Sequence, residues 1–218
     1  MKPPDGIKPL GVIIAGGQSR RFNETSQNPD RPVDKFLMAF GSTTLLGHII
    51  DRAKRQIPHL ILNSNGDPDR LQPFGLDIIS DEIKDVGPLG GILSAMKAAQ
   101  AGGHSHIISF SSDSPFFPDD YVARLVGAVQ KNNVRIAISQ SWGVKSRGKS
   151  EIRSHPVMGI YEVSLQDDLG SYIKSGGRRV LPWINQQPHE KVVWDTSDPD
   201  PFFNINRPEE LAEAEKFL

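Results

Sequence analysis

The chain has 218 residues, and its 25 basic and 26 acidic side chains leave a formal net charge of −1. This length suffices to bury one substantial core, so one domain is the first expectation. The balanced charge excludes an overall basic field of the kind that holds nucleic acid or an anionic membrane surface. The absence of cysteine excludes a disulfide framework, a thiolate metal site and a cysteine nucleophile, and it suits the reducing cytoplasm.

Short apolar runs alternate along the chain with segments of helical period, beginning with the run Leu10–Ala15. Gly16 and Gly17 end this run far below the about 20 apolar residues that a membrane span needs, so neither a signal peptide nor a transmembrane helix is predicted. The alternation predicts an α/β fold, a Rossmann-like three-layer sandwich with a mostly parallel mixed sheet, over a single domain 1–218 with residues 1–9 as a tail. The predicted strands are Gly11–Ala15, His59–Asn63, Leu76–Ser80, His106–Ser111, Arg135–Ser139, Val157–Tyr161 and Lys191–Trp194.

Helices are predicted between these strands, where apolar residues recur on one face, over 45–53, 92–99 and 122–129. Pro118 and Pro208 are each followed by two acidic residues, which predicts that a helix begins at each proline. The polar, basic stretch Gln140–His155 predicts an exposed loop or hairpin.

Several predicted strands end in residues that suit ligand binding. The first strand leads into Gly16-Gly17, and the next three end at or near Asn63, Asp81 and Asp113. Ligands of open α/β sheets bind outside the carboxyl ends of the strands. We therefore expect these groups to converge on one crevice.

The first strand continues into "AGGQSRRF", which places two glycines beside Arg20 and Arg21. Glycine lacks a Cβ, so backbone N–H groups can approach an anion closely, and the two arginines point to phosphate. The spacing fits neither a Walker A loop, because no lysine follows before Lys35, nor the dinucleotide fingerprint, because the glycines are adjacent.

The pattern "IIAGGQSRRF…DKFLMAFG" resembles the signature of nucleotidyltransferases, in which a Gly-rich loop wraps a nucleoside triphosphate. Within that superfamily the chain is most similar to the molybdenum cofactor guanylyltransferases, which join GMP from GTP to molybdopterin. Four further segments carry this closer match: Asp34-Lys35, "DVGPLGGIL" (85–93), "SSDSPFFP" (111–118) and "FFNINRPEEL" (202–211). The chain departs from the family in its extended nucleotide loop, 22–34, which is several residues longer than the usual connection.

The resemblance implies a role for individual residues of this chain. It implies catalysis by Lys35, Arg21 and Asp113, and a Mg²⁺ ion held by Asp113, Asn204 and Asn206. It places molybdopterin near His155, Arg178 and Arg179. It implies nucleotide binding by Ile14, Ala15, Gly16, Gly17, Lys35, Asn63, Asp81, Gly87, Pro88, Leu89 and Asp113.

The residues themselves support these roles unequally. Asp113 lies between an apolar strand and "SPFFP", where a carboxylate is costly unless it is exposed in a crevice or bound to a cation, and Mg²⁺ prefers such hard oxygen ligands. Asn63, Asp81 and the two asparagines of "NIN" are also typical of turns and helix caps. One of Arg20 and Arg21 is expected to be a solvated surface charge, and Arg178-Arg179 also fits a charged loop after a helix.

The expected reaction is in-line attack of the molybdopterin phosphate on the α-phosphorus of GTP, with pyrophosphate leaving. The nucleophile is already an anion, so catalysis rests on alignment and charge neutralisation rather than on a general base. Expected partners are GTP, molybdopterin, and proteins that deliver the cofactor or mature molybdoenzymes. The open alternatives are another nucleotide (CTP for molybdopterin, or a nucleotide for a sugar or isoprenoid phosphate) and a non-catalytic nucleotide-binding adaptor; the glycine spacing disfavours a dinucleotide-dependent oxidoreductase.

Overall fold

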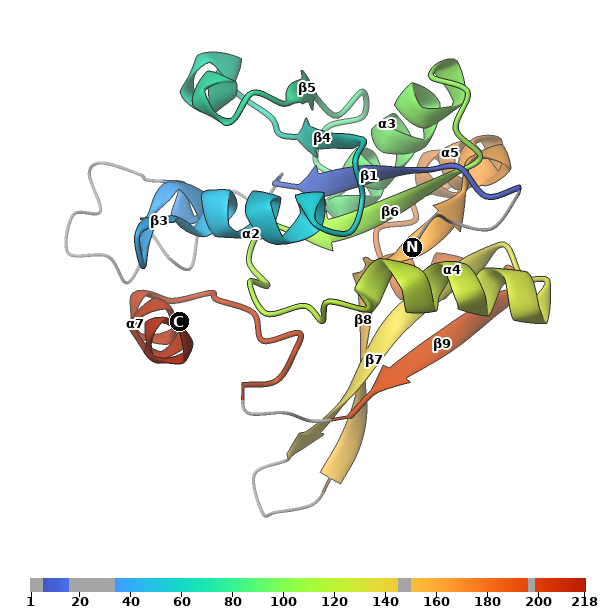
Figure 1. Cartoon of the computed structure of the whole chain (residues 1–218). Helices are drawn as coiled ribbons and strands as arrows, with labels where there is room; N and C mark the ends of the chain where they lie inside the picture. The colour runs from blue at the N-terminus through green and yellow to red at the C-terminus, as the bar shows by residue number, and fades with distance from the viewer. Residues whose placement is uncertain (1–5, 16–33, 145–149, 196–198) are drawn as a thin grey trace.

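A computed structural model describes residues 6–15, 34–144, 150–195 and 199–218. Seven strands form one sheet in the order β5-β4-β1-β6-β8-β7-β9 (Figure 1). Two short strands, β2 (Ala39–Phe40) and β3 (Thr43–Thr44), form a separate hairpin. The strands of the main sheet are β1 (Pro9–Ile14), β4 (Leu60–Asn63), β5 (Asp77–Ile79), β6 (His106–Ser111), β7 (Ile136–Val144), β8 (Ser150–Glu162) and β9 (His189–Trp194).

The sheet is mixed, with β8 as its reversed strand. Strand β1 pairs in parallel with both β4 and β6, and β4–β5 and β7–β9 are also parallel, whereas β8 runs antiparallel to both β6 and β7. In this register Ile14 lies between Asn63 and Ser111, so the carboxyl ends of the three central strands finish side by side. This alignment creates the edge at which the candidate site lies.

Helices cover both faces of the sheet. One apolar cluster joins the sheet to α2 (Leu45–Lys54), α4 (Tyr121–Asn132) and α7 (Pro208–Ala214), and the other joins it to α3 (Pro88–Ala101), α5 (Gln166–Lys174) and α6 (Val180–Ile184). Adjacent side chains of β1 alternate between the clusters, Ile13 in the first and Val12 and Ile14 in the second, as strand geometry requires. The predicted three-layer α/β fold is confirmed.

Short 3₁₀ helices complete the described chain: η1 (Lys35–Leu37), η2 (Pro68–Phe74), η3 (Val163–Leu165) and η4 (Glu215–Phe217). Every helix in the described ranges is too short or too polar to cross a bilayer. Of the predicted N-terminal tail, Ile7 is buried and Pro9 already belongs to β1. The predicted loop 22–34 lies, apart from Asp34, outside the described residues.

Two predicted boundaries can be compared directly with the structure. Helix α7 begins at Pro208, as predicted, but the prediction that a helix begins at Pro118 was wrong, because α4 begins at Tyr121 and Pro118 forms the turn before it. Within the stretch 140–155, the described residues pair as antiparallel strands, since β7 and β8 pair from Gln140 with Ser154 out to Val144 with Ser150, as the hairpin alternative predicts. A register shift between Ile138 and Ser139 marks the start of this extension.

Candidate active site

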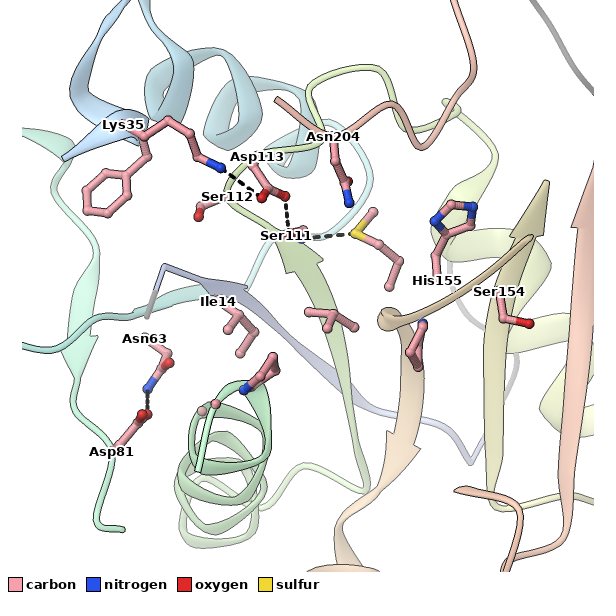
Figure 2. Close-up of a pocket in the computed structure, with 17 residues that line it drawn as sticks. Ile14, Lys35, Asn63, Asp81, Ser111, Ser112, Asp113, Ser154, His155 and Asn204 are labelled. Atoms are coloured by element: carbon pink, nitrogen blue, oxygen red, sulfur yellow. Dashed lines mark hydrogen bonds and ion pairs between the residues drawn. The ribbon is translucent and has the colours of Figure 1, made fainter. Parts of the chain in front are cut away.

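A cleft of about 340 Å³ lies at the carboxyl ends of β1, β4 and β6 (Figure 2). The first turn of α3 lines one side and the middle of β8 lines another, and Lys35 and Asn204 reach the cleft from distant parts of the chain. The lining residues are Ile14, Lys35, Phe36, Asn63, Asp81, Gly87, Pro88, Gly91, Ser111, Ser112, Asp113, Ser154, His155, Pro156, Val157, Met158 and Asn204.

A lysine and a carboxylate define one end of the cleft. Lys35 Nζ lies 3.0 Å from Asp113 Oδ2, and the two side chains are 11% and 21% exposed. The second carboxylate oxygen of Asp113 accepts a hydrogen bond from Ser111 Oγ at 2.6 Å, and Lys35 also donates to the carbonyl of Ile205. Both charges are therefore fixed in place and only partly hydrated, so their fields act strongly on a bound anion or cation.

The segment 204–206 is fastened to the loop that carries Asp113. The Ile205 N–H donates to the Asp113 carbonyl at 2.9 Å, and Ser114 Oγ donates to Asn204 Oδ1 at 2.5 Å. Asn206 lies outside the cleft lining: its amide group donates to the Asn204 carbonyl, and its N–H donates to Glu210. Of the two predicted asparagines, only Asn204 is brought to the cleft.

Amide and carboxylate groups define the opposite end of the cleft, as Figure 2 shows. Asn63 is fully buried at the end of β4, and its amide nitrogen donates to Asp81 Oδ1 at 2.9 Å. Asn65 holds the same aspartate twice, through its amide nitrogen to Oδ2 at 2.9 Å and through its amide oxygen, which accepts the Asp81 N–H at 3.0 Å. Asn63 Oδ1 has no partner among the described residues, which leaves a buried acceptor at this end of the cleft.

The α3 helix approaches this end so closely that it needs glycine. Gly87, the N-cap of α3, has φ 60°, a left-handed conformation that glycine adopts without strain. A Cβ at Gly91 would lie 2.3 Å from Asn63 Oδ1 and 3.2 Å from Ile14 Cδ1. The absence of a side chain at Gly91 therefore allows α3 to pack directly against the amide group of Asn63.

Gly91→Ala is expected to destabilise the fold by roughly 1–3 kcal/mol, the usual cost of overpacking, and to weaken nucleotide binding at this end of the cleft. Chemical denaturation and GTP titration measure the two effects. Gly127→Ala is the control, because Gly127 lies within α4 and a Cβ there would meet no other atom within 4 Å. Alanine at this position should raise the free energy of unfolding by roughly 0.5–1 kcal/mol. Equal stability of the two variants would contradict the close approach.

His155 lies on the side of the cleft that β8 forms. Its ring stacks on Phe202 with centroids 4.8 Å apart, and its Nε2 lies 2.9 Å from Ser141 Oγ, which also contacts Asp200 Oδ2 at 3.3 Å. Burial lowers the pKa of His155; Asp200 opposes this shift and Arg153 adds to it. The imidazole therefore faces the cleft as a neutral group at neutral pH.

The same burial predicts a dependence of stability on pH. The pKa of His155 in the folded chain lies below its ordinary 6.5, so as the pH falls below that value the unfolded chain binds the proton first and the free energy of unfolding decreases. His48 and His106 act in the same direction, because burial also lowers their pKa values. Urea unfolding of the wild type and His155→Gln, from about pH 7.5 to about pH 5.5, should show a smaller loss in the variant. An identical loss in both proteins would refute the contribution of His155.

The remaining predicted residues lie away from the cleft lining or outside the described ranges. Ala15 and Leu89 are buried beside the cleft without lining it. Arg178 and Arg179 lie between α5 and α6, where the Arg178 guanidinium donates to the carbonyls of Ile173 and Gly177 of its own turn. Gly16, Gly17, Arg20 and Arg21 lie outside the described residues.

Several lining residues have no predicted role in the sequence. Ser111 and Ser112 belong to "SSDSP", and polar residues directly after an apolar strand are a signal that could have identified them. Phe36, Met158 and Val157 have apolar side chains, which a sequence cannot distinguish from core residues. Ser154 lies in the stretch that the sequence left open between loop and hairpin.

Comparison with known proteins agrees with this geometry. The MobA-like NTP transferase domain matches residues 11–191. The molybdenum cofactor guanylyltransferase of Nitrobacter hamburgensis is 36% identical over 94% of this chain and 92% of its own, and that of Bradyrhizobium sp. is 35% identical over 94% and 91%. The crystal structure of molybdopterin-guanine dinucleotide biosynthesis protein A from Archaeoglobus fulgidus has the same fold, with a TM-score of 0.67, 18% identity, and coverage of 95% of this chain and 97% of its own.

The family match spans most of the chain and includes the cleft-lining residues from Ile14 to Met158 but not Asn204, and the relatives match over nearly their whole length. The chain is therefore an enzyme of the nucleotidyltransferase class, and it belongs to the MobA-like NTP transferase family and, within it, to the molybdenum cofactor guanylyltransferases.

Proposed function

We propose that this chain transfers GMP from GTP to molybdopterin in the cytoplasm, releases pyrophosphate and depends on Mg²⁺. The observation that carries the proposal is the cleft with a fixed Lys35–Asp113 pair at one end and amide and carboxylate acceptors at the other, in a chain whose relatives bear the name molybdenum cofactor guanylyltransferase. Proteins that deliver molybdopterin or receive the product belong to the same proposal.

The donor set at Asp113 fits a magnesium ion. Mg²⁺ is usually held by one or two carboxylates together with water and substrate phosphates, not by an all-protein cage. Asp113 offers the carboxylate, and Asn204, whose amide oxygen accepts a hydrogen bond from Ser114 Oγ, lines the same cleft. Among the described residues, no group of three or more His, Asp or Glu side chains could hold a metal, which fits a site completed by water and substrate phosphates. A bound Mg²⁺ would neutralise charge on the phosphates.

Lys35 and the residues around it align the two anionic substrates. Two unit charges 4 Å apart repel by about 4 kcal/mol at an effective dielectric constant of about 20, so bringing GTP and a phosphate nucleophile together is costly. The Lys35 ammonium, held by Asp113 and Ile205, supplies a fixed positive charge against the triphosphate. Alignment in the cleft contributes further, because well-oriented reactions gain roughly 7–11 kcal/mol.

The opposite end of the cleft suits guanine. The base carries N–H donors on its Watson–Crick edge, and Asn63 Oδ1 and the Asp81 carboxylate are acceptors. A buried acceptor without a partner costs free energy, so a base that donates to it gains binding and one that cannot is rejected. Guanine presents two adjacent donors, N1–H and the 2-amino group, whereas cytosine presents one, its 4-amino group. Two neighbouring acceptor groups therefore favour GTP over CTP as the substrate.

The test is a comparison of GTP, CTP, ATP and UTP with Mg²⁺ and molybdopterin, following pyrophosphate release together with the thermal shift that each nucleotide produces. GTP should give both turnover and the largest shift, because a bound ligand stabilises by RT ln(1 + [L]/Kd). A chelator of divalent metals should abolish turnover. Binding of GTP without pyrophosphate release would identify a non-catalytic adaptor, and preference for CTP would overturn the base assignment.

A further inference from the structure

A guanidinium group that does not line the cleft joins two segments that do. Arg70, on η2, is ion-paired with Asp34, and the two side chains are 28% and 26% exposed. Its Nη2 donates to Ser64 Oγ at 3.0 Å and to the Asn65 carbonyl at 2.6 Å, and its guanidinium lies 5.7 Å from the centre of the Phe36 ring. Arg70 therefore connects the residues on either side of Lys35 to the loop that follows β4.

The Asp34 carboxylate does not cap the helix that it precedes. Asp34 is the N-cap of η1, and an aspartate at an N-cap commonly accepts a hydrogen bond from the first turn of its own helix. Here no such bond forms, and the carboxylate binds Arg70, 36 residues further along the chain. The orientation of η1, whose first residue is Lys35, thus depends on a contact with another element.

Arg70 is also held by contacts that lie outside η1. Leu71, the next residue of η2, is 1% exposed in the apolar core, and the Asp67 side chain caps η2 by accepting the Asp69 N–H at 3.0 Å. At the end of the cleft formed by Asn63 and Asp81, the side chains of Asn63 and Asn65 hold Asp81 directly, and Arg70 contacts this end through the Asn65 carbonyl. The ion pair with Asp34 therefore links Arg70 to the end of the cleft formed by Lys35 and Asp113, where the triphosphate is proposed to bind.

We infer that Arg70 is a positioning residue, which acts through Asp34 to fix the Lys35 ammonium for the triphosphate. The inference rests on the proposed function of Lys35. Lysine carries its charge on a flexible four-carbon stem, so its backbone must be oriented by its surroundings. The planar fork of arginine binds Ser64, Asn65 and Asp34 at once, a geometry that a lysine at this position cannot reproduce.

The experiment is a double-mutant cycle between Arg70 and Lys35. Wild type, Arg70→Gln, Lys35→Ala and the double variant are compared for pyrophosphate release and for the Kd of GTP with Mg²⁺. Arg70→Gln and Arg70→Lys should each lower kcat by about tenfold to a hundredfold, the effect of a misplaced catalytic group, with KM for molybdopterin nearly unchanged. In the Lys35→Ala background, Arg70→Gln should have almost no further effect on either quantity.

The matched control is Arg135→Lys. Arg135 forms a partly exposed ion pair with Glu162 at 3.0 Å and pairs with Ser164, but Glu162 lies opposite His106, at the other end of β6 from the cleft. This variant should keep wild-type kcat, and unfolding midpoints of all variants separate lost folding from lost positioning.

Two results would overturn the inference: an Arg70→Gln enzyme with wild-type kcat and GTP affinity, or an equal loss from Arg70→Gln with and without Lys35. A wild-type chain that binds GTP but releases no pyrophosphate would instead refute the proposed function, and the cycle measured by Kd would still decide the role of Arg70. A wild-type chain that does not bind GTP would refute both.

Discussion

Asp113→Asn is expected to lower the rate of pyrophosphate release from GTP by about 10³-fold or more. The substitution keeps the size of the side chain and an oxygen that Ser111 Oγ can donate to, but it removes the negative charge that faces Lys35 and would hold Mg²⁺. Charge stabilisation by a metal contributes several kcal/mol to a transition state, and each 1.36 kcal/mol is a factor of ten in rate. Steady-state assays over a range of Mg²⁺ concentrations measure the loss.

The control for this variant is Asp77→Asn, because Asp77 is exposed at the start of β5 and does not line the cleft. It should leave both turnover and the dependence on Mg²⁺ unchanged. If Asp113→Asn retained turnover within a few-fold of the wild type at every Mg²⁺ concentration, the assignment of the metal to this carboxylate would be wrong.

Lys35→Gln is expected to lower kcat by roughly 10²–10³-fold, the loss typical when one preorganised group that stabilises developing charge is removed. Glutamine can still donate a hydrogen bond towards Ile205, so the variant tests the charge of Lys35 more than its packing. The carboxylate of Asp113 keeps its hydrogen bond from Ser111, which limits the structural damage. Single-turnover measurements at saturating GTP separate this loss from weaker binding.

Lys97→Gln is the matched control for the lysine, since Lys97 also forms an ion pair, with Glu82, but lies exposed on α3. Its turnover should equal that of the wild type. The mechanism predicts, in addition, that Lys35→Gln and Asp113→Asn are not additive, because the two groups contact each other and act on the same phosphates. A double variant whose loss is the full product of the two single losses would contradict this shared action.

The edge of the sheet that carries the site could be predicted from the sequence. Apolar runs that end in a polar residue gave the positions of Asn63 and Asp113, and the rule that parallel strands finish at one edge placed them together. The structure agrees with this expectation, because Ile14 pairs with Asn63 on one side and with Ser111 on the other. Local chemistry and strand direction were sufficient at these positions.

The reversed strand and the long-range ion pairs could not be predicted in this way. The outer half of the β7–β8 hairpin, from Gln140 to Ser154, is largely polar, so apolar alternation does not distinguish its strands from a loop. The pairing of Asp34 with Arg70 depends on how η1 and η2 pack together, and the sequence of neither segment indicates which residue the other will bind. Charged residues are common on every surface, so their partners emerge only from the tertiary fold.

The contact of Lys35 with Ile205 has a consequence for the order of refolding. Lys35 and Asp113 are 78 residues apart, and Lys35 and Ile205 are 170 residues apart. Contacts between such distant residues form late, because the entropy of closing a long loop must be lost before they form. A refolding chain that has already paired β1, β4 and β6 still lacks Ile205 on Lys35, so enzymatic activity should return more slowly than the circular dichroism of the sheet and helices.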